Sequence, residues 1–435
     1  MVKKLLTLFL VINSYFTYAE TIKTDVLVIG NGVSAVTAAL QCAHSKVKTI
    51  LLVKGGWLED MQSQKMNYIY SGNNLSSGLW GQFRVEAREL YKREFAFDTT
   101  YNSRLMLQPY TGAAILKKMA DTAKNLTIRL NTTYTAIEKN GTGWEVIITS
   151  NGHTDHIKAR VIVDATTSGE VATKIGATPS PQFTVESSDI GNLYRTSIAI
   201  GDHYEKGGSI GRLFFVPIQT FVVKGEDNLL TTERGFSFDG DIQNLSLQMN
   251  IGQGVGTIAA FCAFFKTTTQ NLKVRLIQGE LLDFKGYLLP FDDVKPTDHY
   301  FRAIQQIAVT GLLKGKANGV RDRGQFDFMP DSVVTTAEVK PVLTEIYSRA
   351  FIWFNNEKPG QQFTIGNLLS FISEITLTDR EQFRITMQKE WKTKYKFNTE
   401  FDLNHPVTRI EFAVLANQFL NPFARTVDLN GRMIN

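Results

Sequence analysis

A strand, a glycine turn and a helix follow one another between Asp25 and Ala43, and this order constrains the fold more than any other feature. DVLVIG is a continuous apolar run, Gly30-Asn31-Gly32 interrupts it, and VSAVTAALQCA is rich in helix formers. A second apolar run, TILLVK at 49–54, follows soon after. Two buried strands joined by one such helix form a right-handed parallel βαβ unit. The sequence therefore predicts an α/β fold.

The glycine turn has the residues that a dinucleotide requires. Gly30 permits the tight turn, Gly32 lets a pyrophosphate approach the backbone, and the small Ala35 lets the helix pack closely on the strand. Amide groups at the start of the helix then face the anion. Because the turn lies between a strand and a helix, we expect a dinucleotide there. An ordinary tight turn is the alternative.

The second strand ends without the acid that commonly bonds the ribose hydroxyls of a dinucleotide. Lys54 stands at that position, and a lysine cannot accept those hydrogen bonds. A phosphorylated ribose, recognition by backbone groups and weakened binding are all consistent with this residue. Glu59, on the following loop, is a further candidate acid.

Hydrophobic periodicity predicts the other elements of the α/β part. An antiparallel meander is expected between Tyr134 and Lys158, with turns at Asn140-Gly141 and Asn151-Gly152. A glycine-rich stretch is expected to open a helix near Gly252. That helix is expected to run to about 265, and another helix is expected at 112–123. Strands are expected at 126–130, 144–150, 159–166, 214–223 and 228–233.

Length and composition bound the class of protein. A chain of 435 residues, with 43% hydrophobic and 20% charged residues, predicts two or three globular domains. Its formal charge of only +5 argues against a nucleic-acid partner. Cys42 and Cys262 fall on predicted helices, where a disulfide and two buried free thiols are both open. His153 and His156 lack further ligands at a suitable spacing, so we predict no metal.

Residues 1–19 have the pattern of a secretory signal peptide. Lys3 and Lys4 form the basic start, 5–12 the apolar run, and Ala19 a small residue before a cleavage point. A membrane-spanning helix needs about 20 apolar residues, and this run is shorter. We therefore expect export to the periplasm or cell envelope, with no transmembrane segment in the mature chain.

Four stretches in order carry a resemblance to a known family. DVLVIGNGVSA, YNSRLMLQPYTGAAILKKM, ARVIVDATTSGEVATKIGA and PIQTFVVKGEDNLLTTERGF…NIGQGVGTIAA resemble the bacterial FAD-dependent oxidoreductases with a glutathione-reductase-like FAD fold. The resemblance covers about 24–265. It implies a Rossmann-like FAD-binding domain at 20–270, with a small substrate cap formed by segments at about 57–110 and 180–215.

The resemblance also implies which residues hold FAD. The glycine turn would contact the pyrophosphate, the end of the second strand the ribose, and the backbone of Tyr134 the adenine. An Asp-Ala-Thr turn would lie beside the cofactor, and a helix N-terminus at 250–253 would face the pyrimidine edge of the flavin, where its dipole stabilises negative charge. The implied residues are Gly30, Gly32, Val33, Ser34, Ala35, Val53, Lys54, Tyr134, Asp164, Ala165, Thr166, Asn250, Ile251, Gly252 and Gln253.

Three departures from the family pattern leave two hypotheses of function open. Lys54 replaces the ribose acid, Glu59-Asp60 stands where the family has Gly-Gly, and Glu233 replaces a glycine of its Ala-Gly-Arg motif. The first hypothesis is an FAD-dependent oxidoreductase of the cell envelope that transfers a hydride from a small-molecule substrate to flavin. The second is a cell-envelope binding or scaffold protein with a degenerate, non-catalytic FAD fold.

No catalytic residue is assigned, because in a flavoenzyme the cofactor carries the electron chemistry. His203 is either a base or a surface histidine on a polar loop. Four aromatic residues are either stacking platforms for a sugar or aromatic substrate or core residues. They are Trp57, Tyr68, Tyr70 and Trp80.

From 271 to 435 the sequence predicts a helical repeat domain. FMPDSVVTTAEVKPVL at 328–343 aligns with FDLNHPVTRIEFAVLA at 401–416. With FDDVKPTDHYFRAIQQIAVTGLLKG, these segments are similar to S-layer homology repeats, which implies a cell-wall polymer as a possible partner. Thr335 and Thr408 are also expected as helix N-caps, with Glu338 and Glu411 completing capping boxes. Only the second copy keeps the arginine of the family motif, Arg409.

Overall fold

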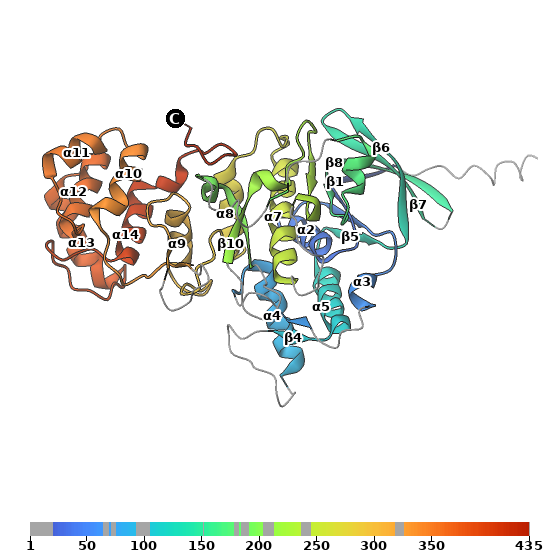
Figure 1. Ribbon diagram of the computed structural model, residues 1–435, viewed down its shortest axis with the longest axis horizontal. Helices are drawn as coiled ribbons and strands as arrows, with labels where there is room; N and C mark the ends of the chain where they lie inside the picture. The colour runs from blue at the N-terminus through green and yellow to red at the C-terminus, as the bar shows by residue number, and fades with distance from the viewer. Residues whose placement is uncertain are drawn as a thin grey trace, which may run out of the picture.

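A computed structural model shows how these segments are arranged (Figure 1). It describes residues 21–63, 69–70, 75–92, 105–150, 152–177, 182–183, 191–202, 213–235, 245–317 and 326–434. The proposed signal peptide lies outside the described residues, as do Tyr68 and His203. Among the described helices, none combines the length and apolar character that a membrane crossing requires.

A seven-stranded sheet forms the centre of the N-terminal part. Its five parallel strands are β5, β2, β1, β8 and β11, and β8 also carries the antiparallel meander β7–β6. This confirms the predicted parallel βαβ unit and the predicted meander. The strands are β1 (Thr21–Ile29), β2 (Thr49–Leu52), β5 (Leu126–Arg129), β6 (Thr132–Asn140), β7 (Gly143–Ser150), β8 (His153–Asp164) and β11 (Leu229–Thr231).

The first strand is a continuous apolar run because both of its faces are buried. Val26 and Val28 pack with helices α2 (Val33–His44), α5 (Pro109–Thr122) and α7 (Leu245–Phe264). Leu27 and Ile29 pack on the opposite face with the meander and with α6 (Glu170–Lys174). Parallel strands covered on both faces lose the alternation of apolar and polar residues that one-sided strands show.

Helices α2 and α7 cross in close contact, and two glycines of α7 make this possible. A Cβ atom at Gly252 would collide with Ser34 and Thr37 of α2, and one at Gly256 would collide with the carbonyl of Ala38. The glycine-rich pattern of this segment therefore serves helix packing. It does not mark the start of a helix, since α7 begins at Leu245 rather than near Gly252.

Smaller elements surround the sheet, and α4 and α5 lie below it in Figure 1. The predicted strand at 214–223 is only half correct, because the chain turns into the 3-10 helix η3 after Pro217. The elements are α3 (Glu59–Gln62), β3 (Ile69–Tyr70), α4 (Gly78–Tyr91), β4 (Met106–Leu107), η2 (Leu193–Thr196), β9 (Ser197–Asp202), β10 (Leu213–Pro217), η3 (Ile218–Phe221) and η4 (Glu233–Gly235).

The C-terminal part is mainly helical and lies at the left of Figure 1. Helix α8 joins it to the sheet domain by packing beside α7. The elements are α8 (Val274–Asp283), α9 (Phe301–Ala308), β12 (Lys316–Ala317), β13 (Phe326–Asp327), α10 (Thr336–Ile346), α11 (Ala350–Glu357), α12 (Ile365–Thr376), α13 (Arg380–Thr393), α14 (Arg409–Leu415), the π-helix η6 (Ala416–Leu420) and η7 (Pro422–Ala424).

Three short segments in this part form a closed ring of backbone hydrogen bonds. The amide of Val334 donates to Val407, that of Val407 to Phe363, and that of Phe363 back to Val334, each at 2.9 Å. Each segment is followed by a threonine that caps a helix, at Thr335, Thr364 and Thr408. The two segments that align in sequence are thus joined by a third, whose cap partner is an asparagine instead of a glutamate.

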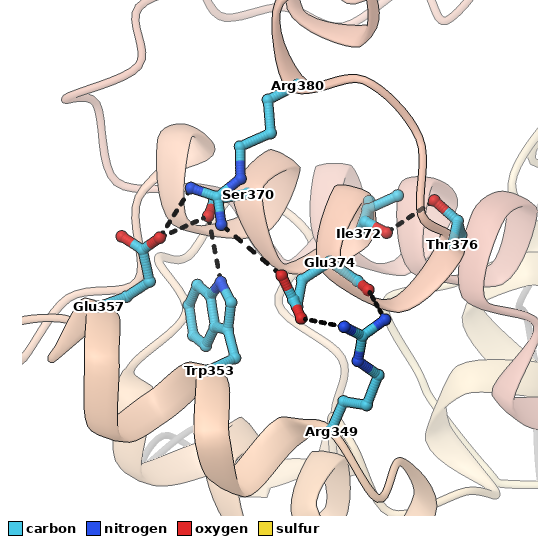
Figure 2. Close-up of polar contacts among 8 residues, drawn as sticks. All are labelled: Arg349, Trp353, Glu357, Ser370, Ile372, Glu374, Thr376 and Arg380. Atoms are coloured by element: carbon cyan, nitrogen blue, oxygen red, sulfur yellow. Dashed lines mark hydrogen bonds and ion pairs between the residues drawn. The ribbon is translucent and has the colours of Figure 1, made fainter.

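Ion pairs tie the outer helices of this part together (Figure 2). Arg380 at the start of α13 contacts Glu357 of α11 at 2.8 Å and Glu374 of α12 at 3.9 Å. Glu374 also pairs with Arg349, at 3.1 Å. Trp353 extends the network by donating to Ser370 at 3.1 Å. Because most of these side chains are partly exposed, the network orients the helices more than it stabilises them.

One buried arginine joins the two halves of the chain. Arg195 of η2 donates to both carboxylate oxygens of Glu345 on α10, at 2.8 and 2.6 Å, and to the carbonyl of Thr310 at 3.2 Å. It also donates to the carbonyl of Gly431 in the C-terminal segment, which returns to this boundary (Figure 1). The helical part is therefore docked on the sheet domain through specific contacts.

Candidate functional site

The glycine turn lies at the carboxyl edge of the parallel strands. The amide of Gly30 donates to the carbonyl of Leu52 at 3.1 Å, which fixes the turn between β1 and β2. A Cβ atom at Gly30 would collide with the carbonyl of Ala165, so only glycine fits there. The amide of Ala165 in turn donates to the carbonyl of Ile29 at 2.8 Å. The structure thus brings together two predicted parts of the site, the glycine turn and the Asp-Ala-Thr turn.

The start of α2 provides backbone donors for an anion. Gly32 is the N-cap and has no side chain to accept from the first-turn amides, and the first turn contains no acidic residue. The first backbone hydrogen bond of this turn runs from Val36 to Gly32 at 3.2 Å. Helix starts of this kind bind phosphate groups through their amides and their positive dipole end.

Asp164 holds the neighbouring turn from inside the protein. Its carboxylate accepts from the hydroxyl of Thr166 at 2.5 Å, from the amide of Thr166 at 3.2 Å and from the amide of Ala172 at 3.0 Å. The side chain is fully buried, and this burial raises its pKa, against the opposing effect of these hydrogen bonds. Asp164 therefore positions Thr166 and α6 and is not itself exposed to a ligand.

The turn after β2, next to the exposed Lys54 in sequence, contacts the carboxylate of Glu59. Val53 is buried, and its amide donates to the carbonyl of Arg129 at 2.9 Å. Glu59 folds back on the turn after β2, where it accepts from the amide of Gly56 at 2.5 Å. Glu59, five residues after Lys54 in the chain, thus provides an acid near the strand end.

Tyr134 lies on β6, at one edge of the sheet. It pairs with Ile148 of β7, and among the described strands none borders the other edge of β6. The Nζ atom of Lys174 lies 5.1 Å from the centre of its ring. Burial, with a smaller contribution from Glu170 and Asp164, raises the pKa of Tyr134 to about 12. The phenol is therefore neutral at physiological pH.

The predicted role of Asn250, Ile251, Gly252 and Gln253 as a helix N-terminus is wrong. These residues lie in the second and third turns of α7, where backbone amides bond to carbonyls of the preceding turn. Gln253 instead accepts from the amide of Leu79 at 3.0 Å and donates to Gln41 at 3.0 Å, which ties α4 to α2. The glycine-rich sequence suggested a helix start at Asn250. The sequence does not show that α7 begins five residues earlier, at Leu245.

Asn250 was predicted from the sequence as a flavin contact, but Ser246, one turn earlier on α7, was missed. The hydroxyl of Ser246 and the Oδ1 atom of Asn250 are buried and have no hydrogen-bond partner in the described part of the chain. The Nδ2 atom of Asn250 donates to the carbonyl of Ile200 on β9 at 3.2 Å. Residues four apart lie on one face of a helix, so both groups line the same side of α7. Only the helix boundary could have indicated this pairing.

The end of β11 also joins the site. Ser34 of α2 contacts the hydroxyl of Thr232 at 3.3 Å, and the amide of Thr232 donates to the carbonyl of Asp164 at 3.2 Å. Thr232 was predicted to lie in a strand at 228–233. The sequence did not predict that this strand, β11, pairs in parallel with β8. The side chain of Glu233 lies outside the described residues.

Two of the four candidate stacking residues, Trp57 and Trp80, have described side chains, and both pack against the protein interior. Trp80 is fully buried and stacks on Phe83, with ring centres 5.5 Å apart. Trp57 is partly buried and donates to the carbonyl of Ala113 at 2.9 Å. Trp80 is therefore a core residue and not a stacking platform. The side chain of Tyr70 is outside the described residues.

Both cysteines are buried free thiols, which confirms one of the two alternatives that the sequence left open. Cys42 donates to the carbonyl of Gly256 at 3.2 Å. Burial raises the pKa of each thiol to about 12. Neither thiol is therefore a nucleophile at physiological pH.

The C-terminal motif is used within the fold. Arg409 is fully buried and donates to the carbonyls of Phe328 and Lys314, at 2.6 and 2.5 Å, and to the carboxylate of Glu338. Its guanidinium is thus not available to an external polymer. The capping box at Thr408 and Glu411 is confirmed. Thr335 caps its helix as predicted, but Glu338 pairs with Arg409 rather than completing a box.

Fold and site together define a dinucleotide-binding α/β protein, and comparison with known families gives the cofactor. Residues 25–180 match the family described as FAD dependent oxidoreductase. The match covers the glycine turn, the second strand, the meander and the Asp-Ala-Thr turn. It identifies the N-terminal part as an FAD-dependent oxidoreductase domain, with FAD as its cofactor. No curated protein matches the chain significantly.

Solved structures resemble the chain only weakly. THI4 of Thermovibrio ammonificans has 13% identity and a TM-score of 0.34, over 61% of this chain and 96% of that one. The rebeccamycin biosynthetic enzyme RebC with reduced flavin has 17% identity and a TM-score of 0.29, over 38% of this chain and 36% of that one. The p-nitrophenol 4-monooxygenase PnpA from Pseudomonas putida DLL-E4 has 16% identity and a TM-score of 0.25, over 37% and 44%. The chain thus spans less than half of the length of RebC and PnpA.

Proposed function

We propose that the protein is an exported FAD-dependent oxidoreductase of the cell envelope that transfers a hydride from a small organic substrate to its flavin. One observation carries the proposal. The glycine turn, the start of α2, the Asp164–Thr166 turn and the end of β11 meet at the carboxyl edge of the parallel strands. Ligands of open α/β sheets bind at this edge.

The residues present fit FAD at both ends of the site. The uncapped start of α2 and the close approach that Gly30 allows suit the pyrophosphate. Ser246 and Asn250 supply a hydroxyl and an amide oxygen that no group in the described part of the chain satisfies. A flavin ring has both an N–H donor and carbonyl acceptors, so these two residues would hold its polar edge. We assign them this role in place of the predicted helix start at 250–253.

The chain itself would bind, orient and shield the reacting groups. When bound, FAD supplies the two-electron acceptor that no side chain provides. The protein groups at the predicted site are mostly buried: Val33, Ser34 and Ala35 are less than 5% exposed. Such a site keeps water from the reacting atoms and strengthens the electrostatic interactions inside it.

A scaffold protein with a degenerate FAD fold is the second candidate, and Lys54 is the observation that favours it. Lys54 is exposed at the strand end where an acid is expected. If Glu59 does not replace that acid, FAD binding is weakened. The two candidates differ in whether the purified protein carries FAD.

Release of the cofactor from the purified full-length chain tests the proposal. We expect denaturation to release FAD in about equimolar amount, and Gly32→Leu to carry little or none, because a side chain at the N-cap blocks the pyrophosphate. Gly360→Leu is the matched control, since a Cβ atom there meets nothing within 4 Å. A folded wild-type protein that contains no flavin and takes up none on reconstitution would contradict the proposal and favour the scaffold.

A further inference from the structure

A cavity of about 440 Å³ lies far from the glycine turn, between the C-terminal half of α7, helix α8 and η7. Figure 1 shows α8 beside α7, at the boundary with the helical part. The wall of the cavity includes four phenylalanines, Phe261, Phe264, Phe265 and Phe423. Its volume is within the range of small-molecule sites, roughly 300–1,000 Å³.

The apolar side chains at this cavity are unusually exposed. Phe264 is 66%, Phe265 56% and Leu276 55% exposed, and all three line the cavity. An exposed apolar cluster around a concave surface is typical of a binding site. The apolar lining alone does not indicate which ligand fits, so the charges in the wall decide.

Arg275 places a buried positive charge in the wall without a carboxylate partner. It is 8% exposed and uses its Nε and Nη1 atoms on the carbonyls of Arg425 and Arg195 and on Gln278, at 3.3, 3.1 and 2.7 Å. Its Nη2 atom is buried and has no hydrogen-bond partner among the residues that the structure describes. No ion pair with Arg275 occurs among the described residues. Burial and, to a smaller extent, the nearby Arg195 lower its pKa to about 9.

Asp283, Arg302 and Glu280, the other charged residues that line the cavity, have ion-pair or hydrogen-bond partners. Asp283 pairs with Arg302 at 2.5 Å. Glu280 accepts from the hydroxyl of Ser45 at 2.8 Å and is only partly buried, so water solvates its charge. Arg275 differs from these groups because it is buried with no counter-charge among the described residues, and its Cζ atom lies 5.0 Å from the centre of the Phe423 ring. Leaving a buried ion without a counter-charge is costly, and an anionic ligand removes that cost.

We propose that this cavity binds a small organic anion, a carboxylate attached to an apolar chain or ring. The carboxylate would offset the charge of Arg275, and the apolar body would cover the exposed phenylalanines. The site is separate from the FAD site. Phe261 is eleven residues beyond Asn250 on α7, or about 16 Å along the helix at 1.5 Å per residue. Binding here does not require FAD, so its test is independent of the proposed oxidoreductase activity.

Filling the cavity through Gly279 gives the sharpest test. Gly279 lies in α8 and lines the cavity, and a Cβ atom there meets only the Nη2 atom of Arg302, at 3.7 Å. Gly279→Leu fills the space, whereas Gly279→Ala makes the same helix-favouring change and leaves most of it open. Both variants are expected to fold, because a glycine inside a helix is replaced by a better helix former.

Calorimetric titration of the full-length protein with decanoate, below its micelle concentration, measures the binding. We expect one decanoate per chain, at least about tenfold weaker binding by Gly279→Leu, and binding by Gly279→Ala within about twofold of wild type. Decan-1-ol, which has no charge, should bind at least about tenfold more weakly than decanoate. Arg275→Gln should reduce the preference for decanoate over decanol.

Three results would overturn the proposal. In the first, Gly279→Leu binds decanoate as tightly as wild type, which places the ligand elsewhere. In the second, decanol binds as tightly as decanoate, which makes the site a purely apolar groove. In the third, the protein sediments with anionic lipid vesicles but takes up no monomeric decanoate, which makes the exposed phenylalanines a membrane contact.

Discussion

Among single residues, Glu59 has the most unusual place in the cofactor site. Its carboxylate accepts from the amide of Gly56 at 2.5 Å, and its second oxygen lies close to Gly55, in the turn that follows β2. Lys54, at the position of the usual acid, is exposed and cannot accept from ribose hydroxyls. A residue from the next turn can therefore supply what the strand end lacks.

We expect Glu59→Ala to weaken FAD binding by about tenfold or more, because a hydrogen bond to a charged group contributes about 1.5–3 kcal/mol. Titration of the apoprotein with FAD, followed by quenching of flavin fluorescence, gives the dissociation constant. Glu89→Ala is the control, since Glu89 is exposed on α4 and pairs with Lys92. Equal affinities for wild type and Glu59→Ala would mean that backbone groups alone recognise the ribose.

Among the elements, the crossing of α2 and α7 decides how the site is built. It brings the start of α2, where we propose that the pyrophosphate binds, next to the helix that carries Ser246 and Asn250. The helices approach this closely only because residues 252 and 256 have no side chains. A single methyl group at the crossing must therefore separate them.

We expect Gly252→Ala to destabilise the protein by about 1–3 kcal/mol through overpacking, although alanine favours a helix. The same change at Gly279 meets open space and should stabilise by up to about 1 kcal/mol. Unfolding in urea, with flavin content recorded in parallel, compares the two variants. The interpretation fails if both substitutions change the free energy of unfolding equally.

At the scale of the whole molecule, the contact between Arg195 and Glu345 links the sheet domain to the helical part. The Arg195 side chain is 2% exposed and that of Glu345 41%. The hydrogen bonds from Arg195 lower the pKa of Glu345. A folded-state pKa below the unfolded value, about 4.3, means that the contribution is present above that pH and is lost as pH falls through the folded pKa.

We expect Glu345→Gln to lower the free energy of unfolding by about 1–2 kcal/mol at pH 7, a value discounted for the partial exposure of Glu345. The difference from wild type should shrink as the pH falls below about 4. Melting temperatures between pH 3 and 7 measure this, with Glu381→Gln as a control because Glu381 lies on an exposed helix face with Arg384. A difference that does not depend on pH would show that the charge of Glu345 does not stabilise the joint.

The sequence determined the features that depend on neighbouring residues. The strand from Asp25, the glycine turn, the meander turns at Gly141 and Gly152, and the threonine caps at Thr335 and Thr408 were all predicted, because turn, cap and strand preferences act over a few residues. The glycine turn also predicted a dinucleotide, since a pyrophosphate is held by backbone groups of one short turn, whereas FAD followed from the resemblance of four stretches to a known family.

The tertiary structure decided what depends on residues far apart in the chain. It showed that the glycines of α7 serve a helix crossing, that Arg409 is buried against Glu338, and that a third segment closes the ring in the helical part. The sequence around a glycine does not show whether the glycine opens a helix or lets another helix approach. Only the position of the partner helix, which is set by packing, distinguishes the two cases. Packing also places Arg275 in the cavity wall without a counter-charge among the described residues.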